Sequence, residues 1–399
     1  MSDTANTAPI GKSRVSTFFH KPWVVSVLSS LVSVVVGLLV GFIVLVCINP
    51  QAAPAAFASM IKFGFTDKNS VANIFYSSAP ILMTGLAVAF AFKAGSFNIG
   101  GAGQYMGGAT FAFVGAALWK LPWPVCILLA LIGGALVGCI PGVLKAFFNV
   151  NEVLSAIMMN WIVQGIFYMV CQSNSAILVT DGATTKVSNI NPSAVLPTWG
   201  LEGIDPNFTI GFVIACILAI IVWLVLEKTN LGFEIKACGL NKDAAKYAGI
   251  NEKKNIILAF TISGALAGIG GALYILMPAA ANSGLDIKYS GIPSQGFDGI
   301  SVALLANNNP IGCIFSALFI QYLTYSGTGL GSAFTHKIPA LIVGVIVYFA
   351  SFVAFVRMMI LRYGGTPFWR KWFKKKPAPT GGTEAPKAEP TTGKEDVSK

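Results

Sequence analysis

Long apolar runs separated by short polar segments make up most of the chain. An α-helix needs about 20 predominantly apolar residues to cross a hydrocarbon layer of roughly 30 Å, and most of the runs come close to that length. The pattern predicts about ten membrane-spanning helices. They are expected at residues 24–48, 71–92, 99–118, 124–147, 153–173, 209–226, 256–277, 297–306, 311–326 and 337–360. The predicted fold is an all-α polytopic membrane protein with a transmembrane domain over residues 24–360.

Two segments interrupt this pattern with glycines and polar residues. The first, "KAGSFNIGGAGQYMGG" at residues 93–108, stands at the start of the third run. The second, "SGIPSQGFDGISVALLANNNP" at residues 290–310, contains an apolar run that is too short to span alone. Irregular backbone is tolerated at membrane depth only where protein or a water-filled cavity satisfies its polar groups. We therefore expect broken helices near the centre of the protein, where transporters place their substrate sites.

The interrupted segments also indicate a repeat. Each follows the first span of a group of four, at residues 71–173 and 256–360, and "FNIGG" in one segment resembles "FDGI" in the other. Alternating spans would give the two groups opposite orientations, as in transporters built from inverted repeats. The shared pattern is short and the loop lengths differ, so a chance similarity is the alternative.

Composition supports the membrane interpretation. Apolar residues make up 55% of the sequence, charged residues only 11%, and the mean hydropathy is +0.71. These values exclude an ordinary soluble globular domain. The formal net charge of +11 would favour nucleic acid in a soluble protein, but the basic residues here gather beside the apolar runs. We therefore expect a lipid bilayer as partner and no nucleic acid.

The same basic residues predict the topology. Three basic regions, the N-terminal segment 1–23, the loop 228–255 and the basic, then disordered tail 361–399, are expected in the cytoplasm by the positive-inside rule. The loop 174–208 has three acidic residues and one lysine and is expected outside. The chain is thus predicted to be a multi-pass protein of the cell (plasma) membrane with both termini cytoplasmic.

No pattern typical of a metal, disulfide or cofactor site is found. The seven cysteines are scattered without a CxxC pair, and the only histidines are His20 and His336. A phosphate-binding GxxxxGKS or GxxxxGKT loop is also missing from the sequence. We therefore expect no catalytic residues, no metal and no cofactor, and ATP hydrolysis on another polypeptide if ATP is used.

Glycines recur four residues apart within the apolar runs. The pairs are Gly134 with Gly138, Gly138 with Gly142, and Gly264 with Gly268. This spacing lets helix backbones approach closely, so we expect helix-packing surfaces at these positions. The stretch "GIGGAL" at residues 268–273 belongs to such a surface, because no strand precedes it as in a dinucleotide-binding loop.

The polar stretch at residues 229–254 has the features of a short helix. Asn241 can cap it, Asp243 suits its positive start, and Gly249 suits a left-handed exit. So short a helix is marginal alone, which predicts a partner packed on its small residues. An ordinary solvated loop is the alternative. The candidate contact residues are Asn241, Lys242, Asp243, Ala244, Ala245, Ala248 and Gly249.

This stretch resembles the coupling segment of ABC-type importer permeases in its "NKDAAKYAGI" core. Four further motifs, taken with "TNLGFEIKACGLNKDAAKYAGI", resemble permeases of the simple-sugar and nucleoside branch in the same order, over roughly residues 70–350. They are "FNIGGAGQYMGGA", "NEVLSAIMMNWI", "SGALAGIGGALY" and "GFDGISVALLANNNPIG". The usual form of the first is "FNIGAEGQ". This chain has Gly101, Ala102 and Gly103 there and so lacks the acidic residue, which leaves the exact substrate open.

The resemblance implies a permease for nucleosides or a related sugar-containing solute. It also implies cytoplasmic ABC ATPase subunits at the coupling loop, a second permease subunit, the same or paralogous, and an extracytoplasmic substrate-binding protein. A neutral solute of this kind is held by flat apolar faces and a few hydrogen-bonding groups. The candidate pathway residues of those types are Phe97, Asn98, Gln104, Glu152, Asn160, Phe297 and Asp298.

Two other interpretations stay open at this point. An ion-coupled secondary transporter would need intramembrane carboxylates, and the nearest ones are Glu152 and Asp298. Each of these can instead be a carboxylate at a helix start. A membrane-embedded enzyme would need a catalytic constellation, which neither histidine provides.

Overall fold

The computed structural model describes residues 22–358, with short gaps. The gaps are 173–177, 182–183, 188–189, 199, 201–202, 204, 206, 279–284, 287–290, 331–337, 351, 354 and 357. Most of the predicted N-terminal segment 1–23, part of the predicted outer loop 174–208 and the whole tail 361–399 therefore lie outside the described residues.

The described chain is almost entirely helical, as predicted. The helices are α2 (Pro22–Ile48), α3 (Ala53–Phe63), α4 (Lys68–Lys93), α5 (Gly101–Ala117), α6 (Trp123–Phe148), α7 (Glu152–Gln172), α8 (Gly211–Lys228), α9 (Asn230–Leu240), α10 (Lys242–Tyr247), α11 (Glu252–Ile275), α13 (Gln295–Leu305), α14 (Pro310–Gly327) and α15 (Ile338–Ala350), with 3-10 turns η1 (Pro192–Ala194) and η3 (Thr328–Leu330). Each predicted span falls on one of these helices. The sequence did not predict α3 or α9.

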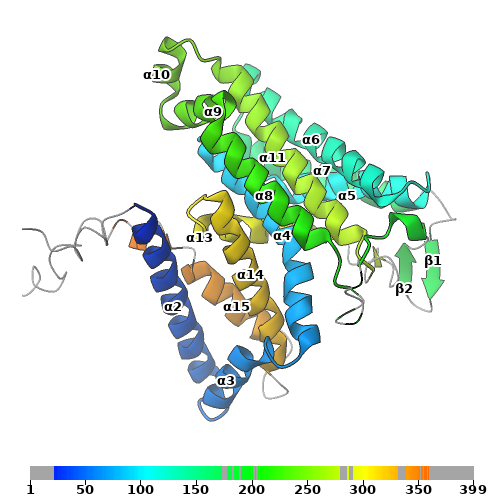
Figure 1. The fold of residues 1–399 in the computed structure, drawn as a ribbon, viewed down its shortest axis with the longest axis vertical. Helices are drawn as coiled ribbons and strands as arrows, with labels where there is room; N and C mark the ends of the chain where they lie inside the picture. Colours follow the sequence, from blue (N-terminus) through cyan, green and yellow to red (C-terminus); the bar gives the residue numbers. More distant parts are fainter. Residues whose placement is uncertain are drawn as a thin grey trace, which may run out of the picture.

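Three short strands form a small antiparallel sheet that the sequence did not predict. They are β1 (Leu178–Asp181), β2 (Thr184–Val187) and β3 (Leu285–Asp286), in the order β1-β2-β3. Leu178 pairs with Val187, and Val187 also pairs with Leu285, so the sheet joins the segment before α8 to the segment after α11. This sheet and the helices α9 and α10 lie at opposite ends of the helical bundle (Figure 1).

Six helices of the described part are long and apolar enough to cross a membrane. Their spans are Val27–Ile48, Lys68–Lys93, Trp123–Phe148, Glu152–Gln172, Gly211–Lys228 and Glu252–Ile275. Of these, α4 and α11 are the most buried, so they form the centre of the bundle. In the other four, most residues are half-buried or exposed, as expected of lipid-facing helices.

Glycines bring α6 and α11 into backbone contact. A Cβ placed on Gly138 would lie 3.0 Å from the Cα of Gly264, and one on Gly134 would lie 2.7 Å from the Cα of Gly268. A Cβ on Gly142 would meet the Cβ of Phe260 at 3.0 Å. The predicted helix-packing role of these glycines is confirmed, because any larger residue would separate the two helices.

Helix packing follows the predicted inverted repeat. The first helix of each unit packs on the second and third helices of the other unit: α4 packs on α13 and α14, and α11 packs on α5 and α6. Accordingly α4 corresponds to α11, α5 to α13 and α6 to α14. The contacts of α5 with α7 and of α13 with α15 continue this pattern. Since α4 runs toward the end that carries α9 and α10 and α11 runs away from it, the two units are antiparallel (Figure 1).

Candidate translocation and coupling sites

The starts of α5 and α13 meet inside the bundle. A Cβ on Gly101 would lie 3.2 Å from the carbonyl oxygen of Gly296, and Gly296 itself packs against Ala102. The Thr84 hydroxyl of α4 donates a hydrogen bond to the carbonyl of Gln295 at 2.8 Å. Both predicted broken segments are thus half-helices whose first turns touch one another beside α4. We call this contact the half-helix junction.

Asn98 and Gln104 fasten the half-helix α5 to α11. The Asn98 amide nitrogen donates to Gln104 Oε1 and to Ser263 Oγ, both at 2.7 Å, and Asn98 Oδ1 accepts the backbone N–H of Gly100 at 3.0 Å. The Ser263 hydroxyl donates in turn to the carbonyl of Ala87 in α4 at 2.6 Å. Asn98 and Gln104 are fully buried. In this conformation their amides therefore bond to the protein and do not line an open path, so their expected contact with solute stays a prediction.

Asn160 of α7 caps the start of α5. Its Oδ1 accepts the N–H of Gly103 at 2.7 Å, and its amide nitrogen donates to the carbonyl of Ile99 at 3.3 Å. A Cβ on Gly103 would lie 2.7 Å from that Oδ1, so glycine is needed there. Ala102, at the position where the usual family form has its acidic residue, is fully buried. Asn160 therefore supports the half-helix, a function that residue type alone did not indicate.

Phe297 and Asp298, in the first turn of α13, keep partly exposed side chains. Phe297 is 37% exposed, and Asp298 stands where a carboxylate favours the positive end of a helix. Phe97 belongs to the loop before α5, and its ring lies 5.4 Å from that of Phe92. Phe297 and Asp298 thus have accessible surface in the first turn of α13.

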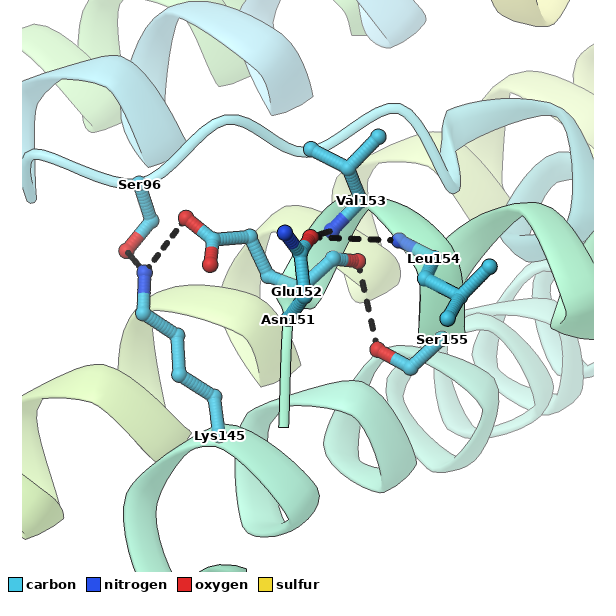
Figure 2. Close-up of polar contacts among 7 residues, drawn as sticks. All are labelled: Ser96, Lys145, Asn151, Glu152, Val153, Leu154 and Ser155. Carbon is cyan, nitrogen blue, oxygen red and sulfur yellow. Dashed lines mark hydrogen bonds and ion pairs between the residues drawn. The ribbon is translucent and has the colours of Figure 1, made fainter. Parts of the chain in front are cut away.

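Glu152 forms an ion pair at the start of α7 (Figure 2). Its Oε1 lies 2.7 Å from Lys145 Nζ of α6, and Lys145 also donates to Ser96 Oγ at 3.0 Å. Asn151 Oδ1 accepts the N–H groups of Val153 and Leu154 and caps the helix. Glu152 is therefore a paired carboxylate at a helix start, which was the alternative to a pathway role.

The coupling segment forms two helices. The predicted cap is confirmed, because Asn241 Oδ1 accepts the N–H of Ala244 at 3.0 Å, and the left-handed exit is confirmed by a φ of +82° at Gly249. Before it, Thr229 Oγ1 accepts the N–H of Gly232 and caps α9. The Thr229 cap was the sequence feature that could have revealed α9.

The exposed surface of this segment differs from the predicted contact face. Ala245 is 4% exposed and packs inside the subunit, whereas Ala244 and Ala248 are exposed. Ala245 is therefore not on the exposed surface of the segment, and α10 packs against α9 and α11. Burial raises the pKa of the Cys238 thiol on the inner side of α9, so that thiol stays neutral. Three large apolar side chains face outward on the two helices: Leu240 (89% exposed), Tyr247 (94%) and Phe233 (67%).

A cavity of about 1070 Å³ opens at the same end of the molecule. It lies between α2, the ends of α4 and α9, and the turn from α13 to α14, and its polar lining includes Lys93, Lys236 and the asparagines at 307–309. Asn307 and Asn308 adopt positive φ, and Asn309 Oδ1 caps α14. The sequence did not predict this cavity, because its walls come from segments far apart in the chain.

Known proteins match the chain over most of its length. The family described as "Branched-chain amino acid transport system / permease component" matches residues 70–360. The nucleoside ABC transporter permease protein NupB of Lactococcus lactis subsp. cremoris is 31% identical over 351 residues, which cover 84% of this chain and 93% of that protein. The guanosine ABC transporter permease protein NupP of Bacillus subtilis is 32% identical over 331 residues, covering 80% and 92%.

A second guanosine ABC transporter permease protein of Bacillus subtilis, NupQ, is 28% identical over 256 residues, covering 61% of this chain and 77% of that protein. The comparison with solved structures gave no match.

The fold and these comparisons define a multi-pass membrane permease subunit of an ABC transporter. The chain belongs to the family of permease components of branched-chain amino acid transport systems.

Proposed function

We propose that this permease carries nucleosides, or a closely related sugar-containing solute, into the cell. The observation that carries the proposal is the similarity to NupB and NupP, named for nucleosides and guanosine, over more than nine tenths of each protein. The matched region includes both half-helices and the coupling helices. No charged group of the described chain is needed to hold such a solute, since a neutral ligand is oriented by aromatic faces and hydrogen bonds.

The substrate pathway passes the half-helix junction and leads toward the cavity at the end that carries α9 and α10. Phe297 and Asp298 offer an aromatic face and hydrogen-bond acceptors at the junction, and Lys93 and the asparagines at 307–309 offer polar groups further in. The remaining candidate residues support the helices around this path: Phe97, Asn98, Gln104, Glu152 and Asn160. A weak site suits transport, because a tight site would retain its solute.

Separate ABC ATPase subunits dock on α9 and α10 and hydrolyse the ATP. Leu240, Tyr247 and Phe233 present large apolar side chains to the surroundings, and such exposed groups mark interaction sites. Ala244 and Ala248 beside them leave room for a partner to approach. The lysines at 236, 242, 246, 253 and 254 support a cytoplasmic position for this end, where an ATPase would be.

A second, paralogous permease and an extracytoplasmic binding protein complete the transporter. This chain resembles both NupP and NupQ, two guanosine permeases of one organism, which supports a pair of different permeases. The binding protein would deliver solute at the end that carries the small sheet. N- and C-termini are on the cytoplasmic side in this arrangement.

Uptake by the reconstituted transporter tests the proposal. The permease, its ATPase and the second permease are placed in proteoliposomes together with the binding protein, and accumulation of radiolabelled guanosine, uridine, ribose and leucine is measured with ATP inside or outside. We expect ATP-dependent accumulation of the nucleosides that excess unlabelled nucleoside abolishes. Accumulation of leucine alone, or uptake driven by an ion gradient without ATP, would overturn it.

A further inference from the structure

The loop 94–100 joins α4 to α5, and it contacts α9 at one end and the half-helix junction at the other. At its start, Gly95 lies backbone to backbone against Gly239 in the last turn of α9. A Cβ on Gly239 would lie 2.8 Å from Gly95 N and 3.0 Å from Ala94 C, and it would also meet the carbonyl oxygen of Lys93. Gly95 has a φ of +68°, which favours glycine. No side chain separates α9 from this loop, so a displacement of α9 moves the loop directly.

Lys145 holds the next residue of the same loop. It donates hydrogen bonds to Ser96 Oγ at 3.0 Å and to Glu152 Oε1 at 2.7 Å, and only 8% of its side chain is exposed (Figure 2). A buried ammonium is costly without partners. We therefore expect Ser96 and Glu152 to move together with the Lys145 side chain. The ion pair therefore links the end of α6 and the start of α7 to the loop.

The far end of the loop is tied to the half-helix junction. Ile99 accepts a hydrogen bond from Asn160, Asn98 bonds to Gln104 in α5, and Gly101 abuts Gly296 of α13. The loop 94–100 thus contacts α9 at its start and reaches the point where the two half-helices meet at its end.

We propose that the Gly239–Gly95 contact and the Ser96–Lys145–Glu152 cluster transmit the movement of α9 and α10 to the half-helix junction. Lys145, Glu152, Ser96 and Gly239 are then positioning residues, which convert ATPase motion into a change at the junction without contacting solute. The inference rests on the proposed docking of an ATPase at α9 and α10.

Lys145→Met tests the cluster, because it keeps the length and apolar stem of the side chain and removes its charge. Transport and ATP hydrolysis are measured separately in proteoliposomes. We expect ATPase co-purification and hydrolysis to persist, while solute moved per ATP falls by about 10-fold, as for an ordinary coupling free energy. Lys253→Met is the matched control, since Lys253 lies at the same end with its ammonium 5.1 Å from the ring of Phe147.

Gly239→Ala tests the backbone contact independently. The added methyl group must push the last turn of α9 away from Gly95. The same loss of transport per ATP is expected. Gly165→Ala, where a Cβ meets nothing within 4 Å, controls for the change of helix propensity.

A reporter at the junction supplies a readout other than activity. Ser294 is exposed next to α13, and its replacement Ser294→Cys allows maleimide labelling against the parent chain as blank. We expect ATP with vanadate to change the labelling rate at this position, and Lys145→Met or Gly239→Ala to abolish that change. Normal transport per ATP in both variants, or loss of ATPase binding in both, would overturn the inference. If the parent chain itself never retains an ATPase, the proposed function fails instead.

Discussion

Glycine determines how closely α6 and α11 approach one another at the centre of the bundle. The contact between Gly264 and Gly138 leaves 3.0 Å for a Cβ, and the carbonyl of Gly134 lies even nearer. At membrane depth such close packing replaces the hydrophobic driving force, which is small between helices in lipid. A methyl group added at one of these glycines must therefore push the two helices apart.

Gly264→Ala is expected to destabilise the permease. Overpacking typically costs about 1–3 kcal/mol, because the helices must separate to admit the methyl group. Thermal denaturation of the purified protein in detergent measures the loss. Gly344→Ala in α15, where a Cβ meets nothing within 4 Å, should leave the midpoint unchanged. Equal midpoints for the Gly264→Ala variant and the parent would contradict the packing argument.

Asn160 allows a second test at this scale. Replacing it by alanine leaves the N–H of Gly103 and the carbonyl of Ile99 without their partner inside the bundle. Each unsatisfied buried group costs about 1–3 kcal/mol, so thermal stability should fall clearly. Asn160→Asp keeps the acceptor and should lose less. If Asn160→Ala instead keeps full stability and loses only solute affinity, Asn160 belongs to the substrate site.

The polar pathway residues show what sequence could and could not predict for single residues. Asn98 and Gln104 were identified as polar groups in a broken helix, and they do lie there. The bonding partner of Asn98, Ser263, is 165 positions away in the chain, in a different repeat unit. Residue type and spacing predict that a buried amide needs partners. They do not say whether those partners are protein or solute.

Among the elements, caps were predictable and orientations were not. Asn241 and Gly249 act locally, through neighbouring backbone, so the sequence alone located α10. The side of α10 that faces the protein depends on packing against α9 and α11, and α9 itself was missed. The half-helices were expected from the same local interruptions, whereas the contact of Gly101 with Gly296 required the fold.

Tryptophan substitutions on α10 separate its two sides. Ala248→Trp adds a bulky group to an exposed position and should abolish co-purification of the ATPase while the permease stays stable. Ala245→Trp should destabilise the permease itself, because that alanine is buried. Lys246→Ala, at an exposed position of the same helix, should be mild. Normal ATPase recovery with Ala248→Trp would indicate that the exposed side of α10 is solvated and does not contact an ATPase.

For the whole molecule, the inverted repeat explains why two half-helices begin at the same depth. A two-fold relation between α4–α7 and α11–α15 maps the start of α5 onto the start of α13, so the two must lie near the axis that relates the units. Apolar periodicity predicted the order of the helices, whereas six helices of the described part, not ten, are long and apolar enough to cross a membrane. It could not predict that α4 and α11 lie at the centre, because both have apolar residues on all sides.

The same arrangement predicts which ends face the cytoplasm. Helices α9 and α10 are at one end of the bundle and the strands β1 and β2 at the other (Figure 1), and lysines gather at the first. Single cysteines at Lys242 and Thr184, on a background in which the exposed Cys47 is replaced by serine, are exposed to an impermeant maleimide in intact cells. Because the positive-inside rule retains basic loops in the cytoplasm, Thr184→Cys should react at once and Lys242→Cys only after permeabilisation. The opposite order would reverse the topology and remove the cytoplasmic ATPase from α9 and α10.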